Sequence, residues 1–237
     1  MKVPCSICGT EILEATAQRT GGMCMLCAKD PVAARKAQLP PPSLDECLIR
    51  LQDALVHALT NGAQRALNEH GADLYGFYLY HHVFEYGILS VLIESGFQET
   101  RQGYHQRYGG YEENSANSRG LRWNACDAPN QDVYGDLTGP IGECFKDLFP
   151  FRGTPGLSST VEQIYINCVA HLRKYGPLPQ EVFLSIQEGD EGNETKVAYA
   201  ELFNSGDTLA CFISDMSPLN EERLELERSR LRPFVQE

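Results

Sequence analysis

Apolar residues recur at every third or fourth position between residues 44 and 67, with polar residues between them. This spacing predicts a long amphipathic helix. At its start, Ser43 and Glu46 have the spacing of a capping box, in which each side chain binds the other residue's backbone N–H. Gly71 is placed to end the helix, because glycine readily adopts the backbone conformation found after a last helical turn.

The remainder of the chain is expected to place helices around one sheet. Residues 73–80 are rich in aromatics and predict a strand, with 84–93 as its neighbour. Residues 101–120 are polar, aromatic and rich in glycine, which predicts a long loop followed by a short extended piece at 121–123. We therefore expect a single mixed α/β domain with a central, mainly antiparallel sheet flanked by helices. Its other elements are helices at 141–149, 158–174, 194–203 and 220–230, and a strand at 181–186.

Cysteine spacing carries the most specific chemical signal. Four of the nine cysteines form two Cys-x2-Cys pairs near the N-terminus: Cys5 with Cys8, and Cys24 with Cys27. Two such pairs supply four sulfurs for a tetrahedral Zn²⁺, and Gly9 suits the first tight turn. Four ligands leave no open position, so the pattern predicts a structural zinc ribbon. With the mixed α/β domain that follows it, the expected fold class is α+β. Unligated thiols, a redox pair and an iron–sulfur cluster are the alternatives.

Three consecutive prolines mark a boundary between two parts of the chain. We expect a zinc ribbon at 1–38, a proline-rich linker at 39–43 and the α/β domain at 44–237. The first part holds five Lys or Arg against three Asp or Glu, a net charge of +2, so the total of −12 leaves −14 on the rest. Nucleic-acid binding needs a concentrated positive surface, so the negative charge of the large domain argues against it there. A zinc ribbon with so little charge favours a structural or protein-contact role.

The N-terminal sequence lacks the apolar core of a secretion signal, and the longest apolar run, near residues 88–93, is too short to span a membrane. We therefore expect a cytoplasmic protein without membrane contact. Cysteines in that compartment are reduced, which favours a metal over disulfides.

Two clusters of polar residues in the large domain have the composition of a metal or acid–base site. His81, His82 and Glu85 could form a metal or acid–base cluster, but neighbouring strand residues point to opposite faces, so chance proximity is the better interpretation. The acidic run at 188–191 follows a strand and could gather a divalent cation. A solvated turn explains that run equally well, with Asn193 capping the next helix.

Cys126 beside Asp127 would be a nucleophile only with a histidine base nearby, and an inert thiol is the simpler interpretation. The sequence contains no phosphate-binding loop, Gly-x-Ser-x-Gly or His-Glu-x-x-His motif. The better candidate is a recognition surface on the expected loop, since tyrosine and arginine anchor many protein interfaces; a mobile loop folded over the sheet is the alternative. Its residues are Tyr104, Arg107, Tyr108 and Tyr111.

Three segments of the large domain carry a resemblance to a known family. They are Asp-Leu-Tyr-Gly-Phe-Tyr-Leu-Tyr at 73–80, Leu-Arg-Trp-Asn-Ala-Cys-Asp at 121–127, and Val-Phe-Leu-Ser-Ile at 182–186 with Gly189-Asp190. Over roughly residues 44–215, the chain resembles the bacterial domain-of-unknown-function family 4303. Residues 5–27 resemble a short zinc ribbon found at the start of some bacterial proteins of unknown function. The family offers no catalytic residues to transfer, and its setting implies an immunity protein that neutralises a bacterial toxin.

These observations favour a non-enzymatic, zinc-containing protein-binding module, with an immunity-type inhibitor of a toxin as the specific form that the resemblance implies. An acidic surface would speed association with a basic toxin. One alternative is an uncharacterised hydrolase that uses Glu188, Asp190 or a His81/Glu85 pair. The other is a nucleic-acid-associated zinc-ribbon protein.

Overall fold

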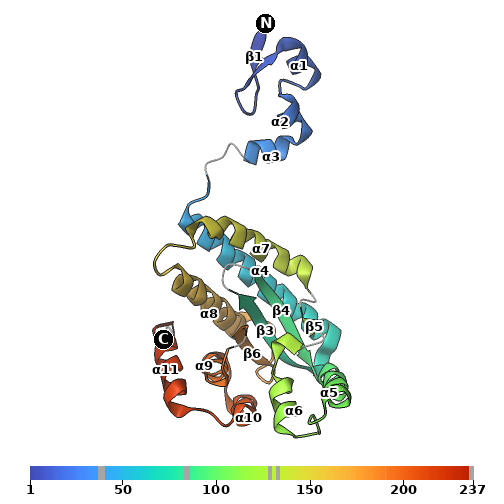
Figure 1. Cartoon of the computed structure of the whole chain (residues 1–237), viewed down its shortest axis with the longest axis vertical. Coiled ribbons are helices and arrows are strands. Elements are labelled where there is room, and N and C mark those ends of the chain that lie inside the picture. The colour runs from blue at the N-terminus through green and yellow to red at the C-terminus, as the bar shows by residue number, and fades with distance from the viewer. Residues whose placement is uncertain (37–40, 83–85, 128–129, 132–133, 190, 235–237) are drawn as a thin grey trace. The chain divides into compact units, whose positions relative to one another are not determined.

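The computed structural model describes all residues except 37–40, 83–85, 128–129, 132–133, 190 and 235–237. The chain divides into two units, Met1–Ser43 and Leu44–Glu237, whose elements are labelled in Figure 1. Part of the expected linker, residues 39 and 40, lies outside the described residues.

A small hairpin and three short helices build the first unit. Among its described residues, only Cys5 and Cys27 are buried, so the unit has no apolar core of its own. A metal ion is a common substitute for a core in a module of this size. The elements are β1 (Lys2–Pro4), which pairs antiparallel with β2 (Glu11–Leu13), and the helices α1 (Glu14–Arg19), α2 (Met25–Lys29) and α3 (Pro31–Lys36).

A four-stranded mixed sheet lies at the centre of the second unit (Figure 1), in the order β5-β4-β3-β6. β4 pairs antiparallel with both β3 and β5, while β6 runs parallel to β3. The parallel pairing sets His81 opposite Glu188 at one end of the sheet. The strands are β3 (Leu74–His82), β4 (Tyr86–Ile93), β5 (Asn130–Gln131) and β6 (Phe183–Glu188).

The long helix α4 (Leu44–His70) confirms the predicted amphipathic helix and buries its apolar face against the sheet. Gly62 lies on that face, and a Cβ atom there would approach Leu89 Cδ1 to 2.4 Å. Glycine, which is unfavourable inside a helix, is therefore used here so that the helix backbone can pack close to β4. α4 continues into a single 3₁₀ turn at Gly71–Asp73.

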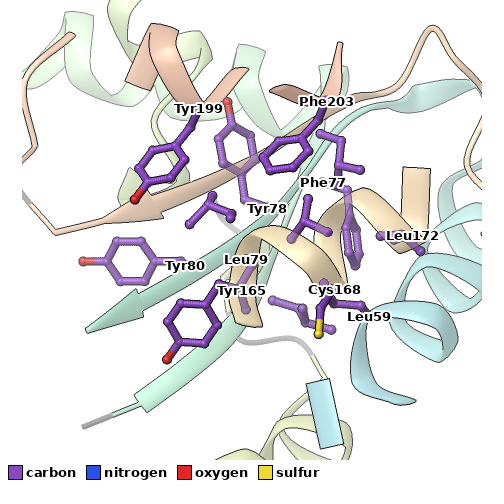
Figure 2. Close-up of a cluster of buried hydrophobic side chains, with 14 of the residues drawn as sticks. Leu59, Phe77, Tyr78, Leu79, Tyr80, Tyr165, Cys168, Leu172, Tyr199 and Phe203 are labelled. Carbon is purple, nitrogen blue, oxygen red and sulfur yellow. The ribbon is translucent and has the colours of Figure 1, made fainter. Parts of the chain in front are cut away.

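Helices cover both faces of the sheet (Figure 1), so the predicted α+β fold with a mixed sheet flanked by helices is confirmed. α7 and α8 pack with α4, and Figure 2 shows Tyr165, Cys168 and Leu172 of α8 among the buried side chains. On the opposite face, Trp123, Phe183 and Phe212 form an aromatic group with ring centres 4.5–5.3 Å apart. The remaining helices are α5 (Glu94–Tyr108), α6 (Ala116–Arg122), α7 (Gly135–Leu148), α8 (Leu157–Tyr175), α9 (Asn193–Phe203), α10 (Gly206–Met216) and α11 (Glu221–Leu231), with 3₁₀ turns at Ala125–Asp127, Phe149–Phe151 and Arg232–Phe234.

The prediction of a long loop over residues 101–120 is wrong, because α5 continues to Tyr108 and α6 begins at Ala116. α5 buries only Gly96, so it lacks the apolar stripe that marks most helices in a sequence. Side-chain pairs one turn apart support it instead, as where Gln98 Nε2 donates to Glu94 Oε1 at 2.8 Å.

Three smaller expectations also fail. Residues 121–123 are not extended, since Arg122 ends α6 and Trp123 caps it. Asn193 does not cap α9: it is the first helical residue, and its side chain donates to the carbonyl of Met216 at 2.9 Å. Helix α10 had no counterpart among the expected elements, and α7 begins at Gly135, earlier than the expected helix at 141–149.

None of the helices in the described part of the chain combines the length and apolar character needed to cross a lipid bilayer.

Candidate functional site

The four N-terminal cysteines come together in space. Their sulfur atoms all lie within 4.8 Å of one another, and Cys8 Sγ is 3.8 Å from Cys24 Sγ. Cys5 and Cys27 are buried while Cys8 and Cys24 are half-buried. Among the described residues, this is the one group of histidine, cysteine or carboxylate side chains whose geometry could hold a metal ion.

Two tight turns position these sulfurs. In the first, the N–H of Gly9 donates to the carbonyl of Cys5 at 3.0 Å, and Gly9 has a φ of +72°, a conformation that favours glycine. In the second, Cys24 caps α2, and its sulfur accepts the N–H of Cys27 at 3.4 Å. The N–H of Cys24 donates to Cys5 Sγ at 3.1 Å, which joins the two turns.

The donor set fits a cation that binds thiolates. Backbone N–H groups, that of Cys8 foremost, lower the pKa of Cys5 to about 6. The neighbouring sulfurs, that of Cys24 foremost, raise the pKa of Cys27 to about 12. Four thiols this close cannot all ionise unless a positive charge lies among them, and a metal ion supplies it. With four protein ligands no position remains for a substrate, so the centre is suited to a structural role.

The predicted recognition residues form an aromatic cluster (Tyr104, Arg107, Tyr108 and Tyr111) at the end of α5. The ring of Tyr104 lies 5.6 Å from that of Tyr108 and 5.2 Å from that of Tyr111, both edge-on. The hydroxyl of Tyr104 donates to Asp127 Oδ1 at 2.6 Å. Tyr108 is 66% exposed, and the Arg107 guanidinium lies 5.8 Å from the centre of its ring. Tyr104, Arg107 and Tyr108 therefore lie on the last two turns of α5, and Tyr111 lies just beyond it in the connection to α6. The role of the cluster in binding stays a prediction.

A cavity of about 350 Å³ lies at the end of β3 and β6, beside α8, α9 and α11. His81 and Glu188, which the strand pairing sets side by side, both line it. His81 is 2% exposed, and its ring lies 4.3 Å from the ring of Tyr165. Neither of its ring nitrogens has a hydrogen-bond partner in the part of the chain that the structure describes. Burial lowers the pKa of His81 to about 3, so the imidazole is neutral near pH 7.

Charged side chains from three further elements complete the cavity wall. Glu162 of α8 accepts hydrogen bonds from the hydroxyl of Tyr199 and from the Arg230 guanidinium. Arg230 Nε also pairs with Glu227 Oε2 at 2.9 Å. Glu191 is half-buried, and loss of water around its carboxyl raises its pKa to about 8.

The other residues singled out in the sequence lie apart from this cavity or outside the described residues. His82 is exposed while His81 is buried, as strand alternation predicts. Glu85 and Asp190, named for a hydrolase, fall outside the described residues. Cys126 is a half-buried thiol whose sulfur accepts from Gln187 Nε2 at 3.7 Å.

Sequence patterns gave no sign of Glu162, Tyr199 and Arg230. They lie on three different helices, and each is more than 30 residues from the next along the chain. Only the packing of α8, α9 and α11 brings them together. The acidic run 188–191 was the one local signal, because it follows a strand end.

No family model matches the chain, and neither curated proteins nor solved structures include a significant match. The geometry of the two units therefore carries the functional argument.

Proposed function

We propose that the protein is a non-enzymatic, zinc-containing protein-binding module of the cytoplasm, and that it acts as an immunity-type inhibitor of a basic bacterial toxin. The observation that carries the zinc part is the cluster of four sulfurs within 4.8 Å, in a unit whose described residues form no apolar core. Zn²⁺ prefers four thiolates in a tetrahedron, and a reduced compartment keeps those thiols available. The residues that would hold it are Cys5, Cys8, Cys24 and Cys27.

Metal analysis of the purified chain tests this part. We expect one zinc per chain, a colourless protein, and loss of the metal in Cys24→Ser. Cys211→Ser is the matched control, since Cys211 is exposed and lies outside the cluster. A brown protein with iron and sulfide would replace zinc by an iron–sulfur cluster. Protein that carries no metal, when purified without chelators, would refute the metal centre.

The binding part of the proposal is supported by charge and by the aromatic cluster. The large unit carries the protein's acidity, which favours a basic partner and accelerates its approach. Tyr108 offers a large exposed ring that packs edge-on against Tyr104, and Tyr104 in turn packs edge-on against Tyr111. Rigid tyrosines lose little conformational entropy when they bind, so they are frequent anchors of protein interfaces. The immunity setting is what the sequence resemblance to family 4303 implies, and no family model match supports that relation.

The proposal predicts that a toxin gene neighbours this gene, and co-expression with that toxin tests it. We expect the protein to restore growth and to co-purify with the toxin, and Tyr108→Ala with Arg107→Ala to weaken both effects by about tenfold or more. Tyr175→Ala is a matched control, because Tyr175 is also 66% exposed but lies at the end of α8, away from the cluster. Equal loss in both variants, or full protection by the double variant, would argue against the aromatic cluster as the docking surface.

A further inference from the structure

The cavity beside His81 has features that neither the zinc centre nor the aromatic cluster uses. His81 is 2% exposed, yet both ring nitrogens lack a partner among the described residues. A buried polar group without a hydrogen bond costs about 1–3 kcal/mol, so such groups are rare in stable proteins. His81 lines a cavity of about 350 Å³, the space of roughly ten water molecules. A ligand bound in this cavity can supply the hydrogen-bond partner that His81 lacks.

The charges of the wall define the kind of ligand. Glu162, Glu188, Glu191 and Glu227 line the cavity together with Arg230, so carboxyl groups outnumber the guanidinium by four to one in the described wall. Arg230 is already engaged by Glu162 and Glu227. The end of the cavity formed by Glu188, Glu191 and the neutral His81 therefore favours a positive charge that carries N–H donors.

We propose that this cavity binds an organic cation, an alkylammonium or alkylguanidinium group, whose N–H donors bond to His81 and to the carboxyl groups of Glu188 and Glu191. A metal ion fits less well, since the described residues place no three ligand atoms close enough here. The cation has two sources with the same chemistry: a free amine or guanidine, or a lysine or arginine side chain of a protein. The inference does not depend on the aromatic cluster.

The site has a built-in pH dependence. Burial raises the pKa of Glu191 to about 8, so cation binding at pH 6 must first release a proton. Affinity for n-butylguanidinium, which stays charged throughout, should rise between pH 6 and pH 9 by up to roughly two orders of magnitude. The groups that act on Glu191 or share its cavity are Glu188 of β6, Lys196 of α9, Arg230 of α11, Glu162 of α8 and His81 of β3.

Calorimetric titration of the full chain tests the proposal with n-butylammonium, n-butylguanidinium, butan-1-ol and butyrate. We expect both cations to bind about tenfold or more tightly than the alcohol and the anion. A capped pentapeptide with a central lysine, compared with its norleucine counterpart, distinguishes the two sources. Tighter binding of the lysine peptide than of n-butylammonium identifies a protein side chain as the ligand, and the reverse identifies a free amine.

Variants locate the binding. Glu191→Gln and Glu188→Gln should each weaken cation binding about tenfold, and Glu191→Gln should also abolish its pH dependence. His81→Phe keeps an aromatic ring against Tyr165 but removes both ring nitrogens, and it should weaken binding comparably. Glu222→Gln, an exposed glutamate on α11 outside the cavity, should leave it unchanged.

The proposal would be overturned if the cations bound no more tightly than butan-1-ol. It would also be overturned if both glutamine variants bound the cations as tightly as wild type does. Should His81→Phe fail to fold, as judged by Trp123 fluorescence, the two glutamine variants decide alone. Toxin protection that depends on Tyr108 is a separate readout, so failure of cation binding would leave the proposed function standing.

Discussion

Substitution of Gly62 by alanine tests how closely α4 approaches the sheet. The new Cβ would lie 2.4 Å from Leu89 Cδ1, 3.4 Å from Phe77 Cζ and 3.5 Å from Tyr134 Cδ2. All four residues are buried, so there is little room for the leucine to move away. Overpacking of this kind costs about 1–3 kcal/mol, while alanine gains about 1 kcal/mol over glycine in helix propensity. The net effect is a destabilisation of up to about 2 kcal/mol.

Gly103→Ala is the matched control. Gly103 lies inside α5, and nothing is within 4 Å of the Cβ that would be added. This variant gains the same helix propensity without the steric cost, so it should be more stable than wild type by about 0.5–1 kcal/mol. The difference between the two variants isolates the packing cost at Gly62, about 1–3 kcal/mol.

Urea unfolding followed by fluorescence measures this difference. The chain has one tryptophan, Trp123, which is 5% exposed in the core of the large unit. With an m-value of about 2–3 kcal/mol/M, the midpoints of the two variants should differ by roughly 0.3–1.5 M. Leu89→Val removes the offending methyl, so its combination with Gly62→Ala should show a favourable coupling of about 1 kcal/mol. Equal midpoint shifts in Gly62→Ala and Gly103→Ala would refute the close approach.

Three further predictions follow from the structure. A strong chelator should unfold the cysteine unit, seen as a loss of its amide dispersion by NMR, while Trp123 fluorescence stays unchanged because that side chain lies in the other unit. Asn204→Ala should lower the free energy of unfolding by about 2–4 kcal/mol, because the Asn204 side chain bonds the N–H and carbonyl of Leu184 on edge strand β6; the exposed Asn167→Ala should cost under about 0.5 kcal/mol. Glu191 has a folded pKa of about 8, above the usual value for glutamate, so the stability it contributes is full below the unfolded pKa and is lost as the pH rises through 8. The free energy of unfolding of Glu191→Gln, measured by urea titration, should therefore rise relative to that of wild type as the pH increases from 5 to 9. Parallel pH profiles of the two proteins would contradict this.

Elements that bury a continuous apolar face were predictable from the sequence. The periodic residues of α4 and the aromatic run of β3 both pack into the core, and both match their expected positions within a few residues. The helix α5 was not predicted because it buries only Gly96 and is supported by polar side-chain pairs one turn apart, which leave no periodic apolar signal. Gly103 and Gly109 also suggested a loop, although only Gly109 has the positive φ that requires glycine.

The two candidate sites differ in how far local sequence determines them. Each Cys-x2-Cys pair fixes its own turn, so the four ligands could be named before any tertiary structure was known. The cavity is assembled from β3, β6 and three helices, and no local pattern specifies which of their side chains meet.

Strand alternation shows where the interpretation of the two histidines was right and where it stopped short. It correctly places His81 and His82 on opposite faces, which excludes a site made from both. The same alternation sends His81 to the face of α8, and the parallel register of β6 then brings Glu188 beside it. A residue about a hundred positions away along the chain thus replaces the sequence neighbour as the partner of His81 in the cavity. The adjacency of the two histidines in the sequence therefore creates no shared site, whereas the strand pairing places His81 beside Glu188 in the cavity wall.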